Sequence, residues 1–120
     1  MEISVGEYVR TDKGNIAKIK EVRLGKHKSL DEFINIYILD NEEWTTDKYI
    51  LKHSKNIIDL IEEGDYVNGS KVIDIAQGKT KAAYIESQEQ KFALIPIVEK
   101  QIKSIVTKEQ IKQIEYRIKE

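Results

Sequence analysis

The chain has 120 residues, which suits one ordinary domain or two very small ones. It contains no cysteine, so disulfides, thiolate metal sites and cysteine nucleophiles are excluded. Its formal net charge of -1 also excludes a global electrostatic attraction to nucleic acid. No apolar run has the length of a membrane span, and Met1–Glu7 lacks the pattern of a signal peptide, so we expect a protein of the cytosol.

The first predicted element begins with Gly6-Glu7-Tyr8-Val9, and this segment returns without a gap as Gly64-Asp65-Tyr66-Val67. A turn is predicted after each copy, at 11–15 in the first and at Asn68-Gly69 in the second. Asn-Gly is the strongest short hairpin signal because both positions accept a positive φ. The repetition indicates that two similar units begin at these points.

The strands predicted next, 16–19 and 72–75, alternate apolar and polar residues in the same phase. We expect their inward residues to be Ala17, Ile19, Ile73 and Ile75. Farther on, the strand at 33–39 corresponds to 81–87, and the strand around Trp44 corresponds to 92–98. The two halves therefore predict the same order of strands.

Each half then ends in a short β-branched run, a hydroxyl residue and apolar positions at helical spacing, at 50–61 and at 105–114. Ser54 and Thr107 are predicted N-caps, and Thr107 with Gln110 completes a capping box. A buried helical stripe is predicted from the spacing of Ile111, Ile114 and Ile118.

Four stretches of the chain resemble two known groups of proteins. GEYVRTDKGNIAKIKEV (Gly6–Val22) resembles the KOW-type opening of small SH3-like β-barrels, and GDYVNGSKVIDI is a shortened version of it. The segments His53–Gly69 and Ile102–Gln110 are similar to segments of small uncharacterised proteins from phages and prophages of low-GC Gram-positive bacteria. The abundance of isoleucine and lysine agrees with a low-GC coding sequence. These resemblances imply a mobile-element setting and bring no catalytic residues.

We therefore predict a mainly β protein with short helices, formed by tandem duplication of two small SH3-like barrel repeats packed together. The repeats are expected at residues 1–62 and 63–120, each with a short helix before its last strand. Coincidence between two hairpin starts is the alternative, but the agreement at both ends of each half favours duplication.

The sequence offers little chemistry. His27 and His53 lack partners at metal-ligand spacing, and we assign them surface or capping roles. The acids of the run 59–65 lack the alternation of a calcium loop and indicate a solvated connector. Glu7 and Asp65 hold equivalent positions, which favours a role in strand entry. Without a phosphate loop or a nucleophile elbow, we predict a protein that is not an enzyme and needs no metal or cofactor.

Binding is therefore the predicted activity. The strongest local charge feature is the basic segment Lys18–Lys28, in which Glu21 is the one acid. Among the aromatic residues, Trp44 has no tryptophan as its counterpart in the second copy, where Phe92 is the nearest match. The candidate binding surface comprises Lys18, Lys20, Arg23, Lys26, Lys28 and Trp44. The simpler interpretation of these cations is a solvated strand face. For the aromatic residues, the simpler interpretation is burial in the core.

The expected partner is a host protein in the bacterial cytosol, such as a component of host defence or transcription. Inhibition of host defence, in the manner of an anti-CRISPR protein, is the sharper form of this hypothesis. The alternatives are nucleic-acid binding through the basic segment Lys18–Lys28 and a small-ligand sponge that uses a cleft between the repeats.

Overall fold

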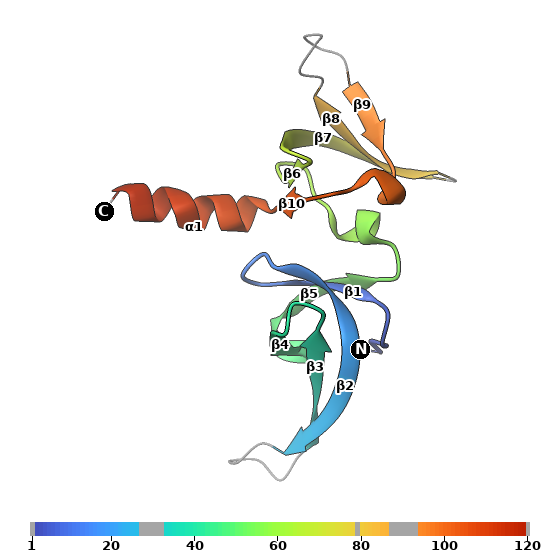
Figure 1. The fold of residues 1–120 in the computed structure, drawn as a ribbon, viewed down its shortest axis with the longest axis vertical. Coiled ribbons are helices and arrows are strands. Elements are labelled where there is room, and N and C mark those ends of the chain that lie inside the picture. Colours follow the sequence, from blue (N-terminus) through green and yellow to red (C-terminus); the bar gives the residue numbers. More distant parts are fainter. Residues whose placement is uncertain (1, 27–32, 79, 87–93, 120) are drawn as a thin grey trace. The chain divides into compact units, whose positions relative to one another are not determined.

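A computed structural model describes residues 2–26, 33–78, 80–86 and 94–119 (Figure 1). These residues divide into two compact units, Met1–Lys55 and Asn56–Glu120. Each unit holds one five-stranded antiparallel sheet. The predicted fold class, mainly β with short helices in a two-part arrangement, is confirmed.

The first unit pairs its strands in the order β4-β3-β2-β1-β5, and a 3-10 turn stands immediately before the last strand, as predicted. Its core gathers around Val9, Ile19, Tyr37 and Leu39, while Lys18 points outward. The elements are β1 (Tyr8–Thr11), β2 (Ile16–Lys26), β3 (Phe33–Leu39), β4 (Trp44–Thr46), η1 (Asp47–Tyr49) and β5 (Ile50–Ser54).

The second unit repeats this order as β10-β6-β7-β8-β9, again with a 3-10 turn before the last strand. Val67, Val72, Ala83 and Ile85 lie in its separate core. The elements are η2 (Ile57–Leu60), β6 (Tyr66–Val67), β7 (Ser70–Gln77), β8 (Lys81–Glu86), β9 (Leu94–Ile97), η3 (Glu99–Gln101), β10 (Ile105–Val106) and α1 (Lys108–Lys119).

The two copies enter their first strands through the same hydrogen bonds. The carboxylate of Glu7 accepts from the backbone N–H of Ser4, and the carboxylate of Asp65 accepts from that of Glu62. The glycine before each acid has a positive φ, 93° in the first copy and 94° in the second, and residues other than glycine rarely adopt this conformation. The strand-entry role predicted for the two acids is confirmed.

The inward residue of the second copy is Val72, so the prediction of Ile73 is wrong. Val72 and Ile19 are both 1% exposed, and each donates its backbone N–H to the carbonyl of the repeat acid at 2.8 Å. Ile73 is 40% exposed, whereas Ile75 is half-buried and packs against the second core, as predicted. A β-bulge follows Ile19 and Val72 alike, and an inserted residue reverses the alternation of every later side chain.

The outer strands correspond through their register. Trp44 pairs with Ile38 in the first unit, and Pro96 pairs with Tyr84 in the second. Since Ile38 and Tyr84 are the first residues paired beyond the equivalent bulges, Pro96 is the counterpart of Trp44. Phe92, the match suggested by the sequence, lies outside the described residues.

The boundary between the units lies between 55 and 56, earlier than the join expected between 62 and 63. Ile58 and Ile61 pack in the second core, so the segment that carries η2 belongs to the second unit. Asn56 caps this turn, because its side-chain oxygen accepts from the N–H of Ile58 at 3.0 Å. The predicted cap, Ser54, instead lies in β5.

The capping box at the start of α1 is confirmed. The N–H of Gln110 donates to the Thr107 hydroxyl at 3.4 Å, and the N–H of Thr107 donates to the Gln110 side chain at 3.0 Å. Ile111 is half-buried, whereas the side chains of Ile114 and Ile118 lie outside the described part of the structure.

Candidate binding surface

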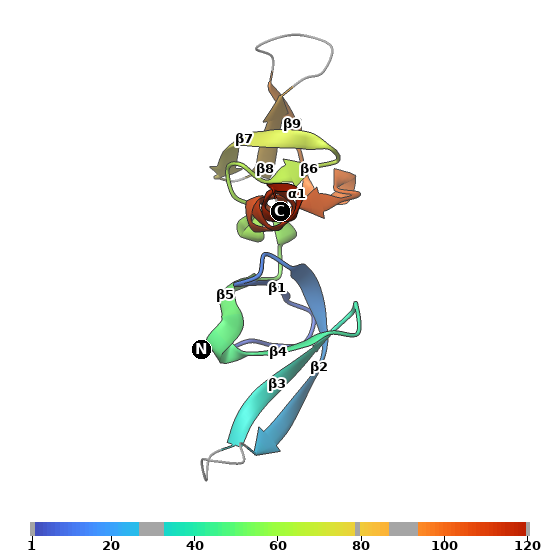
Figure 2. The same cartoon turned by 90° about the vertical axis from the view of Figure 1, so that its left-hand side faces the viewer.

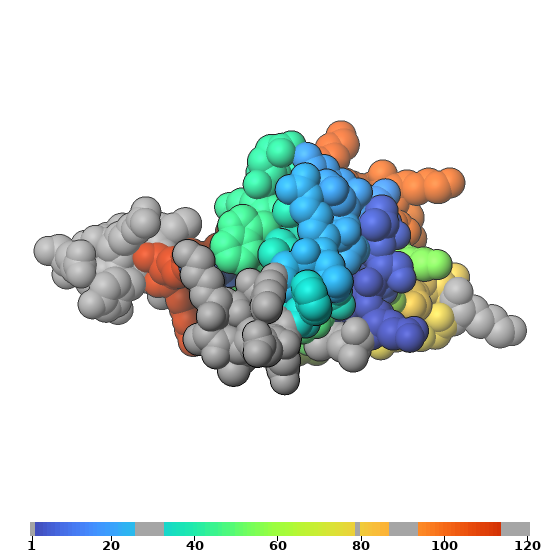
Figure 3. Space-filling model, turned by 90° about the horizontal axis from the view of Figure 1, so that it is seen from below, coloured from blue at the N-terminus to red at the C-terminus, as the bar shows by residue number. Residues whose placement is uncertain are grey.

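The basic residues of the candidate surface follow β2. Lys18, Lys20 and Arg23 are exposed on this strand, whose side chains form part of the surface seen in Figure 3 (light blue). Lys26 ends the strand, but its side chain is not among those described, and Lys28 lies outside the described residues.

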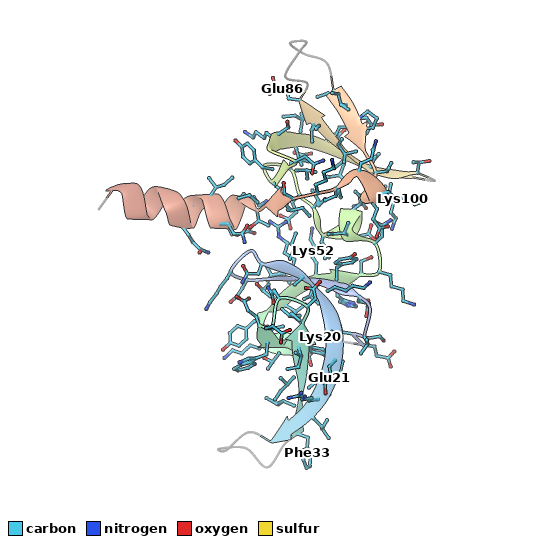
Figure 4. All side chains as sticks on the ribbon, in the orientation of Figure 1. Lys20, Glu21, Phe33, Lys52, Glu86 and Lys100 are labelled. Atoms are coloured by element: carbon cyan, nitrogen blue, oxygen red, sulfur yellow. The ribbon has the colours of Figure 1, made fainter. Side chains whose placement is uncertain are left out.

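Carboxylates accompany two of these cations. The ammonium of Lys20 lies 2.6 Å from a carboxylate oxygen of Glu42, and Arg23 donates two hydrogen bonds to Glu21 at 2.9 and 3.1 Å (Lys20 and Glu21 are labelled in Figure 4). The bonds from Arg23 lower the pKa of Glu21. Glu42 comes from the turn between β3 and β4, so its proximity to Lys20 depends on strand pairing. The local positive charge is therefore weaker than the sequence segment indicates.

The far half of the β2–β3 hairpin carries exposed apolar side chains that the sequence prediction missed. Val22 pairs with Tyr37 and Leu24 with Asn35, so both lie on the same face of the hairpin as Phe33. Their exposed fractions are 36%, 68% and 67%. We call Val22, Leu24 and Phe33 the hairpin patch. In both ribbon views the hairpin extends beyond the other strands of its unit (Figures 1 and 2), and Phe33 is labelled in Figure 4.

In the second unit, η2 lies against β8. Lys81 occupies the register position of Asn35, and its ammonium lies 2.8 Å from both carboxylate oxygens of Asp59 in η2. Ile58 of the same turn is fully buried in the second core. Ahead of β1, the described residues 2–7 form a turn and no such 3-10 segment. Gln77, which holds the register position of Leu24, is exposed in the second unit as well.

Trp44, the aromatic member of the candidate surface, is 65% exposed. It lines a cavity of about 680 Å³ together with Tyr49, Asp12 and Glu43. The cavity lies within the first unit, where the β1–β2 turn, the β3–β4 turn and η1 meet. The predicted one-sided contact surface thus coincides with a hollow in which aromatic and charged side chains converge.

Two titratable groups of the first unit have structural partners. The hydrogen bond from His53 at 2.9 Å, followed by the bond from the Ser4 N–H, lowers the pKa of Glu7. Burial, followed by the 2.8 Å hydrogen bond to Asp47, raises the pKa of Tyr37 to about 12. Each perturbed group is explained by folding contacts, so neither indicates catalysis.

The acids of the run 59–65 are not a solvated connector, and that interpretation is wrong. Asp59 pairs with Lys81, and Glu62 lies 2.7 Å from the ammonium of Lys108. Asp65 is fully buried and accepts from the N–H groups of Glu62 and Lys108 at 2.8 and 2.9 Å. These acids hold η2 and the start of α1 to the second sheet.

Within the described ranges, no three His, Asp or Glu side chains gather in a way that suits a metal ion, and His27 lies outside these ranges. The helices of the same ranges include none with the length and apolar character of a membrane span. No protein-family model, curated protein or solved structure matches the chain. Arguments about function therefore rest on the chain's own surface.

Proposed function

We propose that this chain is a non-catalytic binding protein whose first unit contacts a partner protein through the hairpin patch. One observation carries this proposal: Leu24 and Phe33 are 68% and 67% exposed and lie with Val22 on one face of the hairpin. A two-stranded hairpin is only marginally stable in water by itself, and contiguous exposed apolar surface is typical of interaction sites. A partner that covered the patch would remove this apolar surface from water.

The proposed partner class follows from the resemblance to phage and prophage proteins. A small phage protein without chemistry of its own acts by occupying a host macromolecule. We therefore propose a host protein as the target, either a component of a defence system or of transcription, with inhibition as the consequence. The argument from setting is one of association, whereas the argument for the patch is physical.

The test compares variants in an affinity capture from a low-GC Gram-positive host lysate, with and without nuclease, read by mass spectrometry. The double variant Leu24→Ser and Phe33→Ser removes the patch. Leu51→Ser is the matched control, because Leu51 is a 57% exposed leucine on β5 of the same unit. We expect a stoichiometric, nuclease-resistant protein with the wild type and the control, and its loss with the double variant. Equal capture by all three proteins would contradict the proposal.

Nucleic-acid binding is a second candidate, favoured by the exposure of Lys18, Lys20 and Arg23 along one strand. Contacts to phosphates release counterions, so such binding weakens steeply with salt. Reversal of the three charges should abolish oligonucleotide binding measured by fluorescence anisotropy. Binding that survives the reversal would exclude this strand as the interface, and the paired carboxylates Glu21 and Glu42 already oppose it.

A further inference from the structure

We propose that the cavity beside Trp44 binds a cationic side chain, lysine or arginine, presented by a partner protein. The lining includes Leu39, which is 1% exposed, and the aromatic rings of Trp44 and Tyr49. The cavity, about 680 Å³, is large enough to admit one such side chain. It shares no residue with the hairpin patch, so the two surfaces can be tested separately.

The fold does not require the two aromatic residues. In the second unit, Pro96 takes the register position of Trp44, and η3 ends in Gln101 where η1 ends in Tyr49. The second sheet nevertheless has the same strand order and the same 3-10 turn before its last strand. Trp44 and Tyr49 are 65% and 42% exposed, so a large part of each side chain is open to solvent. Their presence in one copy only indicates a role in binding.

The turn that completes the cavity is also specific to the first unit. Asp12 and Lys13 lie in the longer β1–β2 turn, whereas the second unit closes the same hairpin with Asn68-Gly69. The N–H of Asp12 donates to the carbonyl of Tyr49 at 2.9 Å, which ties this turn to η1. The cavity is therefore built by an insertion relative to its own repeat.

The charges around the cavity select a cation. Its lining carries two carboxylates, Asp12 and Glu43, and the single ammonium of Lys13. Glu43 accepts from the Asn15 side chain at 3.3 Å, which helps to hold its carboxylate in place. Aromatic faces attract cations, and the ammonium of Lys48 already lies 5.6 Å from the centroid of the Tyr49 ring. An anionic ligand would instead meet the carboxylates of Asp12 and Glu43.

The fluorescence of Trp44 reports on the cavity directly, because it is the only tryptophan of the chain. The probe is a capped glycine pentapeptide with a central arginine or lysine, and the control peptide carries neutral citrulline. We expect a saturable change in fluorescence with the cationic peptides and a dissociation constant about tenfold higher for the citrulline peptide. Binding of the cationic peptides should also weaken at high salt. No saturable change, or equal affinity for the citrulline peptide, would overturn the proposal.

Two variants locate the interaction. Tyr49→Gln copies Gln101 of the second unit, and Glu43→Gln removes one carboxylate while it keeps the shape of the side chain. Each should weaken the cationic peptides about tenfold, while Glu99→Gln, a matched change in η3, leaves binding unchanged. Circular dichroism confirms that each variant is folded. Unchanged affinity in both cavity variants would refute the assignment, and removal of Leu24 and Phe33 should not affect it.

Discussion

Replacement of Asp65 by alanine should strongly destabilise the second unit. Its fully buried carboxylate accepts from two backbone N–H groups, of Glu62 at 2.8 Å and of Lys108 at 2.9 Å. A hydrogen bond to a charged group contributes about 1.5–3 kcal/mol, so the loss of two costs about 3 kcal/mol or more. Asp65→Asn keeps one acceptor oxygen and should cost about half as much. For a unit of this size, 3 kcal/mol is a large part of the total stability.

Urea unfolding measures this cost. Far-UV circular dichroism follows both sheets, whereas the fluorescence of Trp44 follows the first unit alone. With a slope of about 1 kcal/mol/M, the transition of the second unit should move down by about 3 M in Asp65→Ala. Glu63→Ala is the control, because Glu63 is an exposed acid of the same run. A midpoint for Asp65→Ala that equals that of the control would refute the reasoning.

Three further variants test the internal contacts by urea unfolding. Tyr37→Phe loses the bond to Asp47 and should cost about 1 kcal/mol. Because the pKa of Tyr37 is raised from 10.0 to about 12, the wild type should lose more stability than this variant as pH rises through that interval; equal losses would contradict it. The pKa of Glu7 is lowered below 4.5, so the stability from its carboxylate is present above that pH and is lost as pH falls through the folded value. Glu7→Gln should therefore flatten the acid dependence, and an unchanged slope would count against the pair with His53. Gly64→Ala forces a side chain into a φ of 94° and should cost about 1–2 kcal/mol, whereas a cost of zero would exclude strain there.

The candidate site was only partly predictable. Trp44 was singled out because the second copy has no tryptophan, and it lines the cavity that we assign to a cation. The hairpin patch was missed, although Phe33–Leu39 has apolar residues on both faces, a pattern typical of a strand that needs two covers. The exposure of Leu24 could be recognised only in the tertiary structure, because it depends on the register that pairs Leu24 with Asn35.

Local patterns in the sequence were enough to establish the repeat and its punctuation. Gly-acid-Tyr-Val, the Asn68-Gly69 turn and the Thr107–Gln110 capping box all depend on φ preferences and on hydrogen bonds between near neighbours, so their residues predict them directly. Two features were decided only by the tertiary structure: the position of the β-bulge after Ile19, and the carboxylate that pairs with Lys20. Those outcomes depend on register, and a single inserted residue reverses the faces of all side chains that follow it.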